Sequence, residues 1–86
     1  MNPRVKKVKA SDNYMLELEF ENGKKGIFSM YPYLQYPMFQ PLNDISFFKK
    51  AYVTMGFVSW NDDIDMSPDT LYLDSKIMAS IPTYTI

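Results

Sequence analysis

The feature that most constrains the fold is a run of alternating side chains that ends in a turn signal. Residues 14–20 read Tyr-Met-Leu-Glu-Leu-Glu-Phe, with large apolar residues at every second position and two glutamates, Glu17 and Glu19, on the other face. This period is typical of a half-buried strand. Glu21-Asn22-Gly23 follows, and Asn and Gly tolerate the positive φ that a tight hairpin needs. The sequence therefore predicts a β-hairpin over Tyr14–Met30.

The register of this hairpin follows from the side chains that each alternative would bury. A two-residue Asn22-Gly23 loop would send Phe28 to the polar face. A loop of three, which adds Glu21 and makes Gly23 left-handed, sets Phe28 opposite Leu16 on the apolar face. Because a slip of one residue exchanges the two faces completely, burial of the larger side chains decides between them. We expect the three-residue loop.

The other elements are short and are marked by capping and turn residues. A lysine-rich edge strand is expected at Val5–Ala10. Ser67-Pro68-Asp69 places Ser at a helix cap and Pro at the first helical position, which predicts a helix over about Pro68–Asp74. In between we expect a helical turn in Ser29–Leu34, an irregular segment with Pro37 and Pro41, a helix Ile45–Lys50 capped by Asn43 or Asp44, and strands Tyr52–Met55 and Phe57–Trp60.

These elements predict an α+β fold, a small antiparallel β-sheet with two short helices packed on it. A chain of 86 residues is too short to divide into two cores, so we expect residues 1–86 to form one domain. The tail, residues 77–86, is apolar but broken by Pro82. This tail could form a terminal strand, bind a partner or remain loose, and the sequence leaves all three alternatives open.

The chain has no Cys and no His, which removes several kinds of chemistry. A disulfide framework, a thiol nucleophile and the commonest general base and metal ligand are all missing. We therefore expect no enzymatic activity, no catalytic residue and no cofactor. No segment approaches the ~20 apolar residues of a membrane span, and no apolar run follows the basic N-terminus as in a secretory signal. The expected location is the cytoplasm, with no membrane partner.

Three signatures occur in order along the chain. They are the hairpin Phe20-Glu21-Asn22-Gly23-Lys24, the turn Pro41-Leu42-Asn43-Asp44 before Phe47-Phe48, and Trp60 followed by Asp65 and Pro68-Asp69-Thr70-Leu71-Tyr72. Together they resemble a bacterial family, the domain of unknown function family numbered 2442, over about residues 4–76. The resemblance implies a small α+β domain with no established enzymatic activity. It also implies a partner, because members often form one half of a small two-gene, toxin–antitoxin-like pair.

The family commonly has Gly where this chain has Asp63. Asp can adopt the left-handed conformation, although less easily than Gly. We therefore expect the turn after Trp60 to be preserved.

Residues 31–41 concentrate tyrosines and prolines, and they are the candidate interaction surface. Its members are Tyr31, Tyr33, Tyr36, Met38 and Phe39, more large apolar side chains than a loop buries locally. Aromatic residues and Met are enriched at protein interfaces. A lid over an open sheet face would explain the same composition. We expect the segment to bind a partner protein that is encoded nearby.

Trp60, Asp65 and Tyr72 are a candidate pocket, because a carboxylate beside two aromatic side chains can orient a polar ligand. The structural interpretation, which we favour, is that Trp60 packs with Leu71 in the core. Asp65 would then satisfy backbone donors before the helix.

Two charged groups complete the candidates. Arg4, Lys6, Lys7 and Lys9 could contact a nucleic acid backbone, although a solvated edge strand explains them better. Asp62, Asp63, Asp65 and Asp69 offer the oxygen ligands of a divalent cation, and a carboxylate- and metal-dependent enzyme centred on them is an alternative function. The spacing, however, lacks the Gly and the final Glu of an EF-hand loop. Turn and helix-terminus roles explain these aspartates, and we expect no metal. The chain could form a homodimer through an exposed edge strand or through the apolar tail, and the sequence does not determine the oligomeric state.

Overall fold

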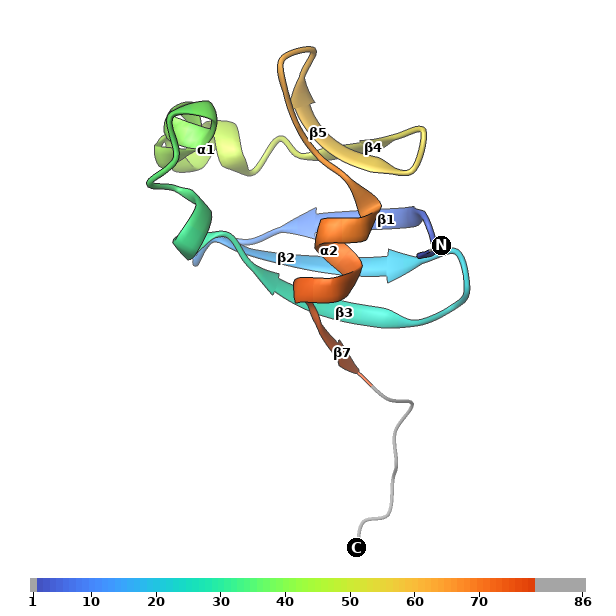
Figure 1. The fold of residues 1–86 in the computed structure, drawn as a ribbon. Coiled ribbons are helices and arrows are strands. Elements are labelled where there is room, and N and C mark those ends of the chain that lie inside the picture. The colour runs from blue at the N-terminus through green and yellow to red at the C-terminus, as the bar shows by residue number, and fades with distance from the viewer. Residues whose placement is uncertain (1, 79–86) are drawn as a thin grey trace, which may run out of the picture.

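The computed structural model describes residues 2–78, which form two antiparallel sheets with short helices (Figure 1). The first sheet has the order β1-β2-β3-β7, with β1 (Val5–Ala10), β2 (Met15–Phe20), β3 (Lys25–Ser29) and β7 (Lys76–Met78). The second has the order β4-β5-β6, with β4 (Tyr52–Thr54), β5 (Phe57–Asn61) and β6 (Ile64–Met66). The helical segments are η1 (Tyr31–Tyr33), η2 (Pro37–Asn43), α1 (Ile45–Phe48) and α2 (Pro68–Asp74). The expected α+β class is confirmed, with the strands divided between two sheets.

The β2–β3 hairpin has the three-residue loop that the sequence predicts. Leu16 lies opposite Phe28, and Glu19 lies opposite Lys25. Gly23 is left-handed with a φ of 87°, and the Phe20 amide donates a hydrogen bond of 2.8 Å to the Lys24 carbonyl to close the loop. The large side chains of both strands therefore share one face, and that face is buried.

One hydrophobic core lies between the two sheets and the helices. Leu16, Phe20 and Phe28 come from the first sheet, Val58 from the second, and Phe48 from α1. All five are fully or almost fully buried. Because both sheets supply side chains to the same core, neither sheet has a separate core of its own.

The two sheets are joined where the chain enters β1. The Val5 amide donates a hydrogen bond of 3.0 Å to the carbonyl of Gly56, which lies in the turn between β4 and β5. That turn has two residues with positive φ, Met55 at 52° and Gly56 at 85°. A Cβ on Gly56 would lie 2.7 Å from the Cβ of Arg4, so only glycine fits under this contact.

Several local expectations hold and others need correction. The helix Pro68–Asp74 is confirmed, with the Ser67 hydroxyl accepting a hydrogen bond from the Thr70 amide. The irregular segment around Pro37 and Pro41 is instead the 3₁₀ helix η2. The helix after Asp44, which caps it, ends at Phe48 rather than Lys50.

Tyr14 differs from expectation, whereas the turn at Asp63 is preserved as expected. Tyr14 has a φ of 63°, so β2 begins at Met15 and not at Tyr14. Asp63, in contrast, is not left-handed. The side-chain oxygen of Asn61 accepts hydrogen bonds from the Asp63 and Ile64 amides at 2.8 and 2.9 Å, and these bonds hold the turn.

The beginning of the tail forms the edge strand β7, paired with β3, and the other expectations for residues 79–86 lie outside the described residues. Within residues 2–78, no helix is long and apolar enough to cross a membrane.

Gly23 and Gly56 make a matched pair for measuring the contact between the sheets. Both have a positive φ, but a Cβ on Gly23 meets nothing within 4 Å. We expect Gly23→Ala to lower the free energy of unfolding by about 1 kcal/mol, the cost of a left-handed alanine. Gly56→Ala also displaces Arg4, so its expected cost is roughly 2 kcal/mol or more in urea unfolding. Equal costs for the two variants would contradict the contact.

Candidate functional site

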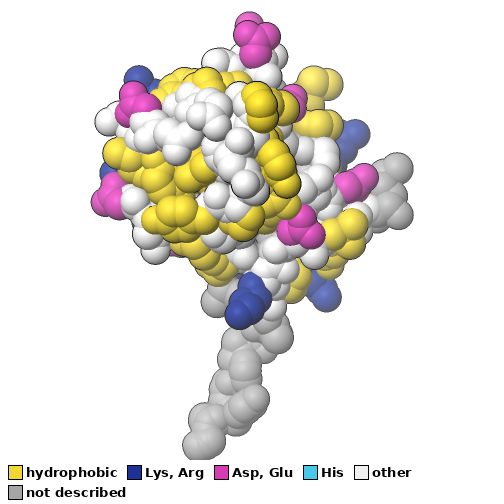
Figure 2. Space-filling model, turned by 60° about the vertical axis from the view of Figure 1, so that its left-hand side comes forward, with side chains coloured by type: hydrophobic (Ala, Val, Ile, Leu, Met, Phe, Trp, Pro, Cys, Tyr) yellow, Lys and Arg dark blue, Asp and Glu magenta, His cyan; other side chains and the backbone are white. Residues whose placement is uncertain are grey.

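Three large apolar side chains project from η1, η2 and the link between them. Tyr31 is 61% exposed, Tyr36 50% and Met38 48%. We call this surface the η1–η2 face. The side of the molecule that carries η1, η2 and α1 shows hydrophobic side chains gathered over much of its area (Figure 2). Single exposed apolar residues are common, but a contiguous group marks a candidate interaction site.

The backbone beneath this face is fixed by side-chain amides. The Gln40 amide donates hydrogen bonds of 3.2 Å to the carbonyls of Leu34 and Gln35. The Asn43 amide donates to the carbonyl of Gln40 at 3.1 Å and to that of Leu34 at 3.4 Å. Proline stands at the start of both η1 and η2 and fixes φ there. A short irregular segment is thereby held in one conformation.

Tyr14 supports the face from below. Its ring lies 5.5 Å from the ring of Tyr31 and 4.8 Å from that of Phe48. Its hydroxyl donates a hydrogen bond of 2.8 Å to the Asn43 carbonyl at the end of η2. Left-handed tyrosine is unfavourable, so these contacts must outweigh its backbone strain.

Tyr33 and Phe39 have a different role from the exposed members of the predicted surface. Phe39 is only 8% exposed and belongs to the core. The Tyr33 ring packs on Phe28, with centroids 5.3 Å apart, and its hydroxyl donates a hydrogen bond to the Asp74 carboxylate on α2. That hydrogen bond, followed by partial burial and the negative charge, raises the pKa of Tyr33 to about 12.

A groove of about 380 Å³ lies beside the η1–η2 face. Its lining residues come from β3, η1, the link between η1 and η2 and the end of α2, and they are Phe28, Ser29, Pro32, Tyr33, Tyr36 and Asp74. The face therefore combines exposed apolar side chains with a concave site that has a carboxylate at its border.

The structure does not bring Trp60, Asp65 and Tyr72 together. Trp60 is 4% exposed, and its indole N–H donates a hydrogen bond of 2.8 Å to the Phe48 carbonyl. Tyr72 packs edge-on against Phe20, with centroids 4.9 Å apart. Asp65 lies on the opposite face of the second sheet from Trp60, because it pairs directly with Ser59. Trp60 and Tyr72 thus have structural roles, and Asp65 lies on the other face of the sheet from Trp60.

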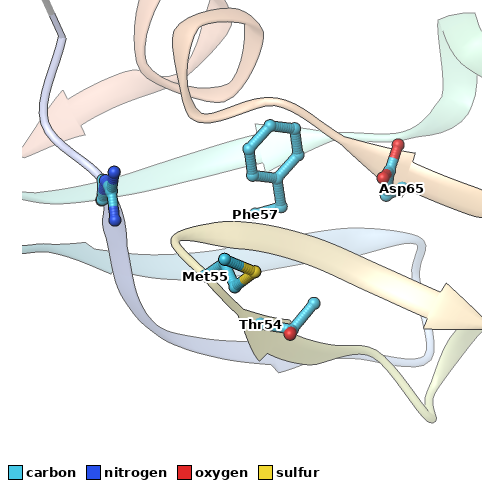
Figure 3. Close-up of a pocket in the computed structure, with 5 residues that line it drawn as sticks. Thr54, Met55, Phe57 and Asp65 are labelled. Atoms are coloured by element: carbon cyan, nitrogen blue, oxygen red, sulfur yellow. The ribbon is translucent and has the colours of Figure 1, made fainter.

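Asp65 instead lines a second concavity that the sequence analysis missed. It has a volume of about 330 Å³ and is lined by Arg4, Thr54, Met55, Phe57 and Asp65 (Figure 3). Arg4 reaches it because the chain before β1 packs on the β4–β5 turn. This juxtaposition of residues about 60 positions apart has no local sequence signal; only the pair Met55-Gly56 marks the turn.

The lysines of β1 lie next to glutamates on the paired strand β2. Lys7 lies opposite Glu19 and Lys9 opposite Glu17, while the Lys6 ammonium is 4.0 Å from Glu19. Arg4 belongs to the second concavity and not to this row. Because opposite charges on paired strands offset each other, the four basic residues do not form a continuous positive surface.

The aspartates of the acidic cluster also point to separate places. Asp62 and Asp63 form the β5–β6 turn, and Asp69 in the first turn of α2 accepts a hydrogen bond of 3.3 Å from Asn2. Asp65 lies on the outer sheet face. Among residues 2–78, no three metal-ligating side chains are placed to hold one ion.

Fold and surface together define a small α+β module with two antiparallel sheets around one core. The model of a protein family of unknown function, DUF2442, matches residues 5–76, which is most of the chain. The chain belongs to this family. Comparison with curated proteins and with solved structures found no match.

The Tyr33–Asp74 contact can be tested by ultraviolet titration of tyrosinate. We expect Tyr33 to ionise at about pH 12, well above the ordinary value of 10.0, and Asp74→Asn to lower its pKa because the charge is removed. The folded chain holds this proton more tightly, so the contact stabilises the fold fully below pH 10.0 and loses its contribution as the pH rises to about 12. The Tyr33→Phe variant should lack the titration step near pH 12, and this loss assigns that step to Tyr33. An unchanged highest transition in Asp74→Asn would contradict the assignment.

Proposed function

We propose that the protein is a non-catalytic interaction module that binds a partner protein through the η1–η2 face. The observation that carries the proposal is that Tyr31, Tyr36 and Met38 are exposed above a backbone held by side-chain hydrogen bonds. These side chains are about half exposed or more, and the amides of Gln40 and Asn43 fix the backbone below them. A preorganised surface loses little conformational entropy on binding, and aromatic residues and Met are enriched at interfaces.

The charge of this region favours a partner with an apolar anchor and basic residues around it. Residues 26–48 contain no Lys and no Arg, while exposed Asp44 ends η2 and Asp74 borders the adjacent groove. Complementary charge at the rim of an interface steers association and fixes orientation. The partner proposed here is the product of a neighbouring gene, as in the two-gene pairs that the sequence resemblance implies.

The same distribution weighs against a nucleic-acid function. Single-stranded nucleic acids are bound by aromatic side chains set in a positively charged groove. In this chain the exposed tyrosines of residues 31–36 have no cation within their own segment, and the basic strand β1 faces Glu17 and Glu19. The two features that such binding needs are on different parts of the molecule.

Co-purification with the product of each adjacent gene, followed by calorimetric titration, tests the proposal. The triple variant Tyr31→Ala/Tyr36→Ala/Met38→Ala should weaken binding about 30-fold or more, as expected for an interface hot spot worth about 2 kcal/mol. Leu73→Ala is the matched control, because Leu73 is 70% exposed but lies on α2 and does not line the groove. Binding unaffected by the triple variant, or no binding by any neighbouring product, would overturn the proposal.

A further inference from the structure

The outward face of the second sheet is a separate apolar surface. Met55 is 83% exposed, Tyr52 43% and Phe57 37%, and all three lie in β4, β5 or the turn between them. Met55 and Phe57 also line the concavity of about 330 Å³ (Figure 3). The surface therefore has both a protruding side chain and a hollow beside it.

Met55 adopts a left-handed backbone conformation, which is unfavourable for methionine. In the two-residue β4–β5 turn its φ is 52°, where Asn or Gly is the usual residue. No burial offsets this strain, because Met55 is the most exposed of the large hydrophobic side chains described. Backbone strain that no contact within the monomer offsets is typical of positions with a binding role.

The concavity carries one positive and one negative side chain. Arg4 packs over Gly56 at the β4–β5 turn, whereas Asp65 lies on β6 at the other edge of the sheet. Phe57 is on the central strand between them. Within residues 2–78, the ion pairs within 4.0 Å join Lys6 to Glu19 and Lys49 to Asp12, so neither Arg4 nor Asp65 is paired. Among the described residues, this surface therefore carries opposite charges without an ion-pair partner on the two sides of an apolar centre.

We propose that this surface binds a second copy of the chain in a two-fold symmetric dimer. A two-fold axis presents the same patch on both copies, so each contact occurs twice. Rotation about an axis near Phe57 brings Arg4 of one copy to Asp65 of the other, and the reverse. Met55 of each copy then enters the concavity of its partner, where a flexible and polarizable side chain packs well. Charge self-complementarity selects a second copy over an unrelated protein.

This dimer extends the proposed function without depending on it. The residues of the dimer surface lie on β4–β6 and before β1, whereas the η1–η2 face lies on a different segment, residues 31–43. A dimer would carry two η1–η2 faces and could bind two partner molecules. Failure of partner binding would leave the dimer intact, and failure of the dimer would leave single-site partner binding.

Sedimentation equilibrium of the full chain and a charge exchange test the dimer. Arg4→Glu and Asp65→Arg each replace two opposite-charge contacts by two like-charge contacts, so each should weaken dimerisation about tenfold or more. An equimolar mixture of the two variants should form a heterodimer, because both of its contacts again join opposite charges. Lys50→Asp and Asp62→Arg are controls on exposed charges outside the concavity, and they should leave the dimer unchanged.

Met55→Gly separates binding from folding. Gly relieves the left-handed strain, so this variant should unfold at a higher urea concentration while its dimer becomes weaker. A wild-type chain that stays monomeric at millimolar concentration would overturn the proposal. A mixture of Arg4→Glu and Asp65→Arg that fails to associate, or a Met55→Gly dimer as tight as the wild type, would also overturn it.

Discussion

The register of the β2–β3 hairpin is the constraint on which the rest of the structure depends. Gly23 can take a φ of 87°, which allows the three-residue loop, and the loop places Leu16 and Phe28 on one face. A shift by one residue would move Phe28 to the charged face, away from Leu16, and would break up the apolar surface on which the other elements pack. The outer face keeps its charges, with Glu19 between Lys7 and Lys25 on the neighbouring strands. The second sheet, α1 and α2 then cover the apolar face and complete one core.

The η1–η2 face is a consequence of how the chain leaves this hairpin. The Met30 amide donates a hydrogen bond of 2.9 Å to the Tyr14 carbonyl, so η1 starts beside the left-handed residue that precedes β2. The Tyr14 side chain reaches across to Asn43, and the Tyr33 hydroxyl reaches α2 at Asp74. Core residues such as Phe39 and Leu42 anchor the segment from inside. With both sides anchored, the exposed parts of Tyr31, Tyr36 and Met38 face solvent or a partner.

The parts of the fold that could be predicted from sequence are those specified within a few residues. Alternation and the Glu21-Asn22-Gly23 turn were sufficient for the hairpin, and Ser67 with Pro68 was sufficient for α2. The two sheets are joined by the contact between Val5 and Gly56, which local patterns do not encode. The direction of Asp65 could not be predicted either, because it depends on pairing with Ser59 across a register shift in β5–β6. Composition indicated an apolar surface in residues 31–41, and Tyr31, Tyr36 and Met38 are exposed there. Phe39 is buried and Tyr33 packs on Phe28, because tertiary contacts decide which aromatic side chains turn inward.

Native-state hydrogen exchange measured by NMR tests the central claim, that residues 31–43 form a rigid surface in the free protein. The amides of Leu34, Tyr36 and Phe39 donate backbone hydrogen bonds to Tyr31, Tyr33 and Tyr36. If the segment is preorganised, these amides should be protected to a degree approaching that of Phe20 in the hairpin. Exchange at the rate of an unstructured peptide, while the Phe20 amide stays protected, would show that the face is not formed before binding and would contradict the account.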